Sequence, residues 1–102
     1  MDPGTPDTIM ISDVVISTAG RDRGQWFYVI KVEPMFLYLV NGKDRTLDKP
    51  KRKKRKHIQK VLRSETRVAE KLRNGDKVLN GELRRDLAAI SRDMQSDNLG
   101  GF

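Results

Sequence analysis

The chain has 102 residues, 36% hydrophobic residues and a formal net charge of +7, so it has room for one small domain with one modest core. It contains no cysteine and one histidine, His57, which excludes disulfide bonds, thiolate catalysis and zinc ribbons and leaves no expected metal site. No apolar run approaches the roughly 20 residues that cross a bilayer, and the first ten residues are acidic where a signal peptide is basic, so we expect a cytoplasmic protein.

Three β-strands are predicted in the N-terminal half. Residues 1–10 contain two prolines and a glycine and are expected to be a flexible lead-in. Residues 14–17 and 25–33 are rich in β-branched and aromatic residues, which predicts two strands around a glycine-bounded loop. Pro34-Met35 predicts a tight reversal, because proline cannot continue a central strand. Residues 36–41 are the predicted third strand.

Two more strands are expected before the helices. Asn41-Gly42 is a strong hairpin signal, because both residue types tolerate positive φ, so a short fourth strand near residues 46–47 is expected to pair with the third. Residues 57–62 alternate apolar and polar side chains, which favours a fifth strand. Five short strands over residues 11–63 predict a small bent barrel, since a flat sheet of this size could not protect its edges.

The last third of the chain is predicted to be helical over residues 64–94. Ser64 is the expected N-cap of a first helix that ends at Arg73, before Asn74-Gly75. Asn80 is the expected cap of a second helix. Its apolar residues fall at i, i+4, i+7 and i+11 and form one stripe, made by Leu83, Leu87, Ile90 and Met94. Residues 95–102 are expected to be a disordered tail. The predicted fold class is mostly β with a C-terminal α extension of one or two short helices.

Positive charge is concentrated in one segment. From Lys43 to Arg63 there are 11 basic and 2 acidic residues, a local charge of +9, whereas the other 81 residues have a net charge of −2. Such a localised field is typical of proteins that bind polyanions, either nucleic acid or an anionic membrane. Residues 51–56 are all cationic and lie between two predicted strands. No lipidation motif or basic amphipathic helix accompanies them, which disfavours a membrane.

The segment "DVVISTAGRDRGQWFYVIKV" resembles a KOW motif, with a short apolar strand, a polar loop of the form A-G-R-D-x-G and an alternating apolar strand. The continuation "NGKDRTLDKPKRKKRKHI" is similar to the ribosomal-protein-like KOW group, in which a hairpin precedes a basic run that ends in Lys-His and an aliphatic residue. Together they resemble the small bacterial KOW-domain RNA-binding proteins similar to archaeal and eukaryotic large-subunit ribosomal proteins. The resemblance implies an SH3-like barrel that binds RNA, usually structured ribosomal RNA.

Candidate RNA contacts lie first in the glycine-bounded loop. Gly20 and Gly24 allow backbone conformations that project Arg21 and Arg23 outward. Arginine suits this position because its planar fork makes bidentate phosphate contacts. Asp22 would repel phosphate, so it is expected to hold the loop or to pair with an arginine. The alternative is a solvated loop whose charges bind nothing.

The hairpin and the basic run supply the other candidate contacts. They are Lys43, Arg45, Lys49, Lys51, Arg52, Lys53, Lys54, Arg55, Lys56 and His57. Cations of this kind bind phosphates with little base selectivity, and five neutralised phosphates predict a log–log salt slope of about −3.5 to −4.5. His57 can equally bind phosphate or pack at the start of the fifth strand, and the run can also be a solubilising surface.

Three consecutive aromatic residues, Trp26, Phe27 and Tyr28, must alternate between the two sides of a strand. At least one aromatic side chain is therefore expected to leave the barrel core. Trp26 is a candidate for stacking on an unpaired base, although packing beneath the C-terminal helices is the favoured interpretation.

No catalytic assembly and no nucleotide-binding glycine loop is recognisable, so we predict a binding protein and not an enzyme, without cofactor or small-molecule substrate. The leading hypothesis is an RNA-binding KOW protein associated with the ribosome or ribosomal RNA, with ribosomal proteins as further partners. The alternative is an SH3-like protein-interaction module of the transcription or translation machinery with accessory nucleic-acid contact. The string "PKRKKRK" also has the form of a nuclear localisation signal. Such signals need an accessible extended segment, so the position of the run between two predicted strands disfavours this alternative without removing it.

Overall fold

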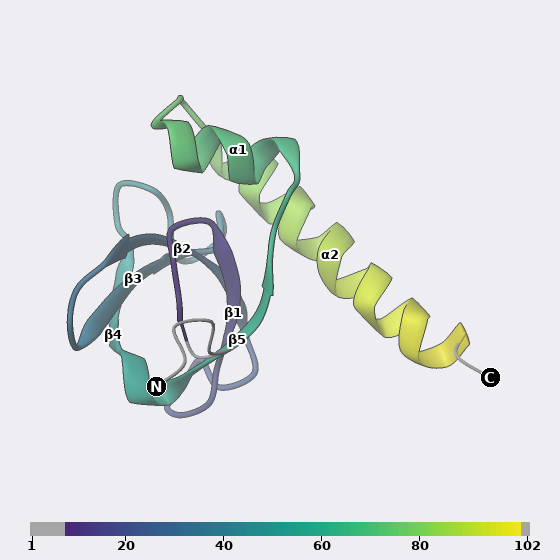
Figure 1. Cartoon of the computed structure of the whole chain (residues 1–102), viewed down its shortest axis with the longest axis horizontal. Helices are drawn as coiled ribbons and strands as arrows, with labels where there is room; N and C mark the ends of the chain where they lie inside the picture. The colour runs from purple at the N-terminus through teal and green to yellow at the C-terminus, as the bar shows by residue number, and fades with distance from the viewer. Residues whose placement is uncertain (1–7, 101–102) are drawn as a thin grey trace.

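The computed structural model describes the backbone of residues 8–100 and the side chains of residues 8–95. It contains one antiparallel sheet with the strand order β4-β3-β2-β1-β5, followed by two helices (Figure 1). The strands are β1 Asp13–Ser17, β2 Trp26–Val32, β3 Phe36–Val40, β4 Lys51–Lys54 and β5 Ile58–Arg63; the 3₁₀ turn η1 is Arg55–His57, and the helices are α1 Arg67–Asn74 and α2 Asn80–Gly100. The prediction of a mostly β fold with a C-terminal helical extension is confirmed.

The sheet is strongly bent. Its register shifts between Val14 and Val15 in β1, and between Val29 and Lys31 in β2, and irregularities of this kind increase strand bending and twist. Figure 1 shows the strands curving around a common interior. In the described part of the chain no ladder joins the edge strands β4 and β5, so the sheet is open in its backbone pairing, and the closed barrel stays a prediction.

Both faces of the sheet are buried at its centre. The inner face contributes Val15, Phe27, Val29, Leu37 and Leu39 to one apolar cluster. The opposite face contributes Val14, Tyr28 and Val40 to a second cluster, which the helices complete with Val68, Ala69, Leu83 and Leu87. Phe27 and Tyr28 therefore point to opposite faces, as strand alternation requires, and Trp26 and Tyr28 are the two aromatic residues of β2 that leave the interior. Tyr28 is nevertheless fully buried, because it packs in one cluster with residues of both helices.

The predicted position of the fourth strand is wrong. Residues 46–47 lie in the loop that connects β3 to β4, and the strand is formed by the basic residues of β4 themselves. β4 pairs with β3, with Leu39 opposite Lys51 and Phe36 opposite Lys54. Lysine has a low strand propensity, so this strand depends on tertiary pairing and has no signal in its own composition.

The start of α1 differs by two residues from its prediction. Thr66, and not Ser64, is the N-cap, and its side chain accepts a hydrogen bond from the backbone N–H of Ala69 at 3.2 Å. The C-cap is Gly75, in the left-handed region at φ 76°, as Asn74-Gly75 predicted. Left-handed glycine caps are favoured because glycine has no Cβ to clash with the preceding carbonyl.

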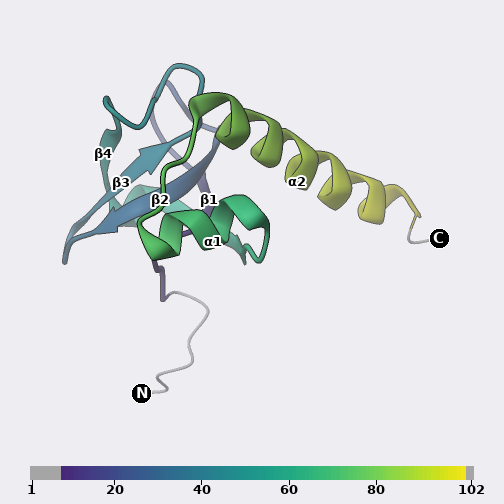
Figure 2. The same ribbon diagram turned by 90° about the horizontal axis from the view of Figure 1, so that it is seen from above.

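The second helix begins at Asn80, where its cap was predicted, but it continues to Gly100. The expectation of a disordered tail from residue 95 is therefore wrong for residues 95–100, and residues 101–102 lie outside the described part. Leu83 and Leu87 of the predicted stripe are buried, whereas Met94 is exposed. The helix leaves the sheet between these points and projects away from it (Figures 1 and 2).

The predicted flexible lead-in is only partly described, because residues 1–7 lie outside the described part. Ile9 is buried and belongs to the inner apolar cluster. The backbone N–H of Met10 donates a hydrogen bond to the Asp13 carboxylate at 2.8 Å. Residues 8–10 are therefore part of the folded unit, which corrects the prediction for these three positions.

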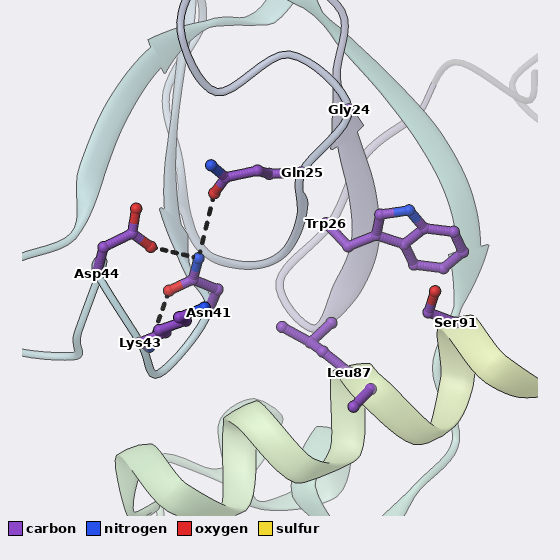
Figure 3. A pocket seen from close by; sticks show the side chains of 9 residues that line it. Gly24, Gln25, Trp26, Asn41, Lys43, Asp44, Leu87 and Ser91 are labelled. Carbon is purple, nitrogen blue, oxygen red and sulfur yellow. Dashed lines mark hydrogen bonds between the residues drawn. The ribbon is translucent and has the colours of Figure 1, made fainter.

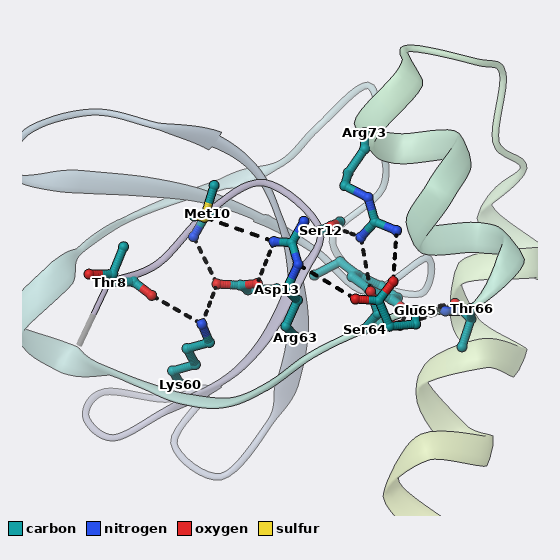
Figure 4. A network of polar contacts seen from close by, with 11 residues as sticks. Thr8, Met10, Ser12, Asp13, Lys60, Arg63, Ser64, Glu65, Thr66 and Arg73 are labelled. Carbon is teal, nitrogen blue, oxygen red and sulfur yellow. Dashed lines mark hydrogen bonds and ion pairs between the residues drawn. The ribbon is translucent and has the colours of Figure 1, made fainter. Parts of the chain in front are cut away.

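A polar network fixes α1 to the sheet (Figure 4). Asp13 is fully buried, and its carboxylate lies 3.1 Å from Lys60 Nζ and 3.7 Å from Arg63 Nη1. Arg73 of α1 donates to Ser12 Oγ at 2.8 Å and to the Ser64 carbonyl at 2.9 Å. Both cations of β5, Lys60 and Arg63, are thus paired with the buried Asp13 carboxylate, so β5 adds little to a surface for anions.

A second network lies where Tyr28 meets the helices. Its hydroxyl contacts Ser64 Oγ at 2.8 Å, Thr66 Oγ1 at 3.2 Å and the Asp86 carboxylate of α2. Burial, together with the hydrogen bond to Asp86, raises the pKa of Tyr28 to about 12. The fold therefore holds the neutral phenol at a junction of β2, the segment before α1, and α2.

Tyr28→Phe is expected to lower the free energy of unfolding by about 1–3 kcal/mol, because it removes buried hydrogen bonds of the phenol to Ser64, Thr66 and the Asp86 carboxylate. Since the folded pKa lies above the ordinary value of 10.0, the hydroxyl stabilises the fold fully below about pH 10 and progressively less towards about pH 12. The difference in the free energy of unfolding between the wild type and Tyr28→Phe should therefore become smaller from about pH 10 to about pH 12. Denaturant unfolding at several pH values measures it. Tyr38→Phe, at a half-buried position, should change stability by no more than about 0.5 kcal/mol.

Candidate nucleic-acid interface

The basic run forms a strand, so its side chains alternate between two faces. Lys53 is only 9% exposed, and its ammonium group donates to the Ala19 carbonyl at 2.7 Å and to Asp22 Oδ1 at 2.8 Å. Lys51 Nζ lies 3.5 Å from the other oxygen of Asp22. Arg52 and Lys54 are exposed. The structure thus corrects the prediction that Lys53 is a surface phosphate contact, and it divides the run into an inward and an outward half.

The glycine-bounded loop lies against the inward half of β4. Asp22 is buried, and the Ser17 hydroxyl donates to its carboxylate at 2.7 Å. Burial opposes ionisation of this carboxyl, but hydrogen bonds from Lys53 and Ser17 and the lysine charges outweigh burial and lower its pKa to about 2. As predicted, Asp22 holds the loop, although its cationic partners are lysines and not arginines.

The two arginines of this loop, Arg21 and Arg23, are exposed. Gly20 and Gly24 adopt left-handed conformations at φ 87° and 88°, which is the backbone freedom that the sequence predicted. Because Asp22 turns inward to Lys53, its charge is directed away from the surface that carries the arginines. The loop therefore presents two cations to solvent while its one carboxylate is neutralised underneath.

The outward half of β4 lies beside two aromatic rings of β3. The Arg52 guanidinium lies 3.6 Å from the centroid of the Phe36 ring, and Lys31 Nζ lies 5.1 Å from the centroid of the Tyr38 ring. Strand pairing places Phe36 opposite Lys54 and Tyr38 opposite Arg52. We call the surface made by Lys31, Phe36, Tyr38, Arg52 and Lys54 the β3–β4 outer face.

Neither Phe36 nor Tyr38 was among the predicted site residues. The alternation in "FLYLV" was the available signal, because Leu37 and Leu39 on one face require Phe36 and Tyr38 on the other. What the pattern could not show is which cations lie beside these rings. That depends on the register between β3 and β4.

A shallow pocket of about 270 Å³ continues this surface past the turn between β2 and β3. Its apolar part is Pro34 and Met35, and its cationic part is Lys54, Arg55 and Lys56. The Met35 side chain is 67% exposed. Arg55 is half-buried and donates to the Glu33 carbonyl at 3.1 Å, while Lys56 is exposed.

The remaining predicted contacts lie at the end of the sheet that carries the β1–β2 and β3–β4 loops. Asn41 donates to Gln25 Oε1 at 3.5 Å, which links the two loops. Lys43 and Lys49 are exposed and Arg45 is half-buried. The backbone carbonyl of His57 accepts a hydrogen bond from the backbone N–H of Thr18 at 2.9 Å. The His57 imidazole is half-buried, so phosphate binding and packing by this side chain both stay predictions.

Trp26 lies at a cleft of about 480 Å³ between these loops and α2 (Figure 3). Its ring is half-buried and packs against the cluster that contains Leu83 and Leu87, in agreement with the favoured prediction of packing beneath the helices. Lys43, Asp44 and Ser91 also line the cleft. Part of the Trp26 ring faces the cleft. The stacking of Trp26 on an unpaired base therefore stays a prediction.

Other kinds of site find little support in residues 8–95. Within this range no group of three or more histidine, cysteine or acidic side chains is arranged to hold a metal ion. No helix among the described residues combines the length and the apolar character needed to span a membrane. The sequence matches no protein-family model, and a search of curated proteins gives no significant match.

Proposed function

We propose that this chain is a KOW-type RNA-binding protein, built on an SH3-like barrel and associated with the ribosome or ribosomal RNA. The observation that carries the proposal is the β3–β4 outer face, where exposed cations and aromatic rings share one surface. Cations bind the phosphates of a nucleic acid and aromatic rings bind its bases. Neither group alone distinguishes RNA from other polyanions, but their combination on one face favours a nucleic acid.

Hydrogen bonds of the β1–β2 loop to residues at both edges of the sheet support the barrel. Lys53 of β4 hydrogen-bonds the Ala19 carbonyl and Asp22 in the β1–β2 loop. The backbone N–H of Thr18 donates to the carbonyl of His57, directly before β5. These contacts tie the loop to both edge strands where backbone pairing between β4 and β5 is missing.

The cations available for phosphates are those with exposed side chains in the predicted set. They are Arg21, Arg23, Lys43, Lys49, Arg52, Lys54 and Lys56. Three of them, Arg52, Lys54 and Lys56, come from the basic run. The run therefore contributes about half of the phosphate contacts that its sequence suggests, because the other residues face inward or are half-buried.

The triple variant Arg52→Gln, Lys54→Gln, Lys56→Gln is expected to weaken binding to a structured ribosomal RNA fragment. Its log–log salt slope should be about 2–3 smaller in magnitude than that of the wild type, because three phosphate contacts are lost. Fluorescence anisotropy between about 50 and 200 mM salt measures both quantities.

A charge-matched control uses three exposed cations from the helical part: Arg67→Gln, Lys77→Gln and Arg92→Gln. The control loses the same net charge and should keep most of the affinity and the slope. Equal effects of the two triple variants would mean that only overall charge attracts RNA. If the wild type has no salt-sensitive affinity for RNA and does not sediment with ribosomes at low salt, the proposed function is wrong.

A further inference from the structure

We infer that the β3–β4 outer face binds unpaired bases by stacking, so that the protein prefers single-stranded RNA segments to continuous duplex. This inference rests on the proposed function and specifies which part of an RNA the face contacts. Phosphate contacts alone would not discriminate in this way, since every strand has a phosphate backbone.

The first stacking position is the Arg52 guanidinium on Phe36. The distance of 3.6 Å from Arg52 Cζ to the ring centroid is van der Waals contact, so the ring covers one side of the guanidinium. Arg52 Nε also lies 3.4 Å from Glu33 Oε1, which restrains the group in its plane. The Arg52 side chain is still 51% exposed. A restrained guanidinium with a free side is a surface on which a base can stack.

The second position is the Tyr38 ring, which is half-buried and has Lys31 Nζ over one of its faces, 5.1 Å from the ring centroid. Phe36 and Tyr38 are two residues apart on β3, which separates them by about 6.6 Å along the strand. Successive bases in a duplex are about 3.4 Å apart and stack on each other, so their faces are not accessible. Two bases about twice that distance apart belong to an extended single strand, which is the partner that this spacing fits.

The charges around the two positions match a nucleotide chain. Lys31 lies by Tyr38, and Lys54 is opposite Phe36 in the ladder, so each ring has a cation within reach of the adjoining phosphate. Glu33 is the carboxylate at this face, and it is paired with Lys31 at 3.9 Å and with Arg52 at 3.4 Å. The pocket at Met35 continues the surface with the apolar residues Pro34 and Met35 and the cations Lys54 and Lys56.

The test separates stacking from charge with Arg52→Lys, which keeps the positive charge but removes the planar group. The probes are a fluorescein-labelled unstructured RNA of about 12 nucleotides and a blunt RNA duplex of the same length. The wild type should bind the single strand more tightly. Arg52→Lys should weaken single-strand binding at least about fivefold, the low end of the effect of losing one stacked base, and should leave duplex binding within about twofold.

Two further variants make the result specific. Tyr38→Leu removes the second ring without changing charge and should also weaken single-strand binding selectively. Arg92→Lys, at an exposed position of α2, is the matched control and should affect neither RNA. Circular dichroism and thermal melting establish that each variant is folded.

The outcomes distinguish this inference from the proposed function. If the wild type binds both RNAs but Arg52→Lys changes neither affinity, or changes both equally, the stacking inference is overturned and the proposed function stands. If the wild type binds neither RNA, the proposed function fails as well. Equal competition by polyglutamate would assign the face to acidic proteins and also overturn the inference.

Discussion

Lys53→Met is expected to lower the free energy of unfolding by about 3 kcal/mol, the low end for breaking a buried ion pair, because it removes the nearest cation of the buried Asp22 carboxylate and leaves Lys51 Nζ at 3.5 Å as its cationic partner. Asp22 accepts hydrogen bonds from Lys53 at 2.8 Å and from Ser17 at 2.7 Å while it is buried. The Lys53 ammonium also donates a hydrogen bond to the Ala19 carbonyl. In the variant, the loop that carries Arg21 and Arg23 therefore loses this attachment to β4. Chemical denaturation monitored through the tryptophan fluorescence measures the loss.

The pH dependence gives this prediction a second readout. The folded pKa of Asp22 is about 2 and its ordinary value is 3.8, so the ionised carboxylate stabilises the fold. This stabilisation, about 2 kcal/mol, is fully present above about pH 4 and is lost as the pH falls towards about pH 2. Lys53→Met removes the interaction that lowers the pKa of Asp22 most. The loss of stability between about pH 4 and about pH 2 should therefore be smaller in Lys53→Met than in the wild type.

Lys54→Met is the matched control, since it removes the neighbouring cation of the same strand at an exposed position. It should change stability by no more than about 0.5 kcal/mol. The double variant Lys53→Met, Asp22→Asn should recover part of the loss, because no buried charge is left without a partner. A loss as large in Lys54→Met as in Lys53→Met would contradict the division of the run into inward and outward halves.

Gly42→Ala is expected to be the second strongly destabilising change, at about 2–5 kcal/mol. Gly42 has a left-handed φ of 77°, and a Cβ there would lie 2.1 Å from the Asn80 carbonyl oxygen and 2.9 Å from the Arg84 backbone nitrogen. The conformation alone costs about 1–2 kcal/mol for a residue with a Cβ, and the steric overlap adds about 1–3 kcal/mol as the start of α2 is displaced. Denaturant unfolding measures the total, and hydrogen exchange in α2 locates it.

Gly24→Ala is the control that separates these two contributions. Gly24 has a similar φ of 88°, but a Cβ there meets no atom within 4 Å. It should therefore cost only the conformational part, about 1–2 kcal/mol, with no change in the exchange of α2. Equal costs at the two glycines would show that the contact between residue 42 and α2 contributes nothing.

The elements of the fold that depend on neighbouring residues could be predicted from the sequence. Alternation of apolar residues identified β1, β2, β3 and β5 to within a few residues, because burial of one strand face imposes a period of two. The spacing of Leu83 and Leu87 identified the buried stripe of α2. The pair Asn41-Gly42 predicts a hairpin turn with positive φ at both residues, but only Gly42 of the two has a positive φ. Glycine is required at position 42 because α2 approaches it closely.

The candidate site was predicted less completely than the fold. The exposed cations Arg21 and Arg23 were correctly placed in a loop with left-handed glycines, since that conformation depends on nearby residues. The burial of Lys53 was not predicted, because it needs Asp22, which is distant in the chain and lies in the β1–β2 loop, next to β4 only in the bent sheet. The stacking of Arg52 on Phe36 likewise depends on cross-strand register.

By itself the sequence determined that this protein has bent antiparallel strands, an amphipathic C-terminal helix and one strongly cationic segment, since each of these follows from composition or local periodicity. The tertiary structure alone decided that the cationic segment is an edge strand, that Lys51 and Lys53 turn inward to Asp22 while Arg52 and Lys54 face outward, and that aromatic rings lie beside the outward pair. The physical reason is that a charged side chain has no intrinsic preference between two faces of a strand; the partners brought to each face by strand pairing make the choice.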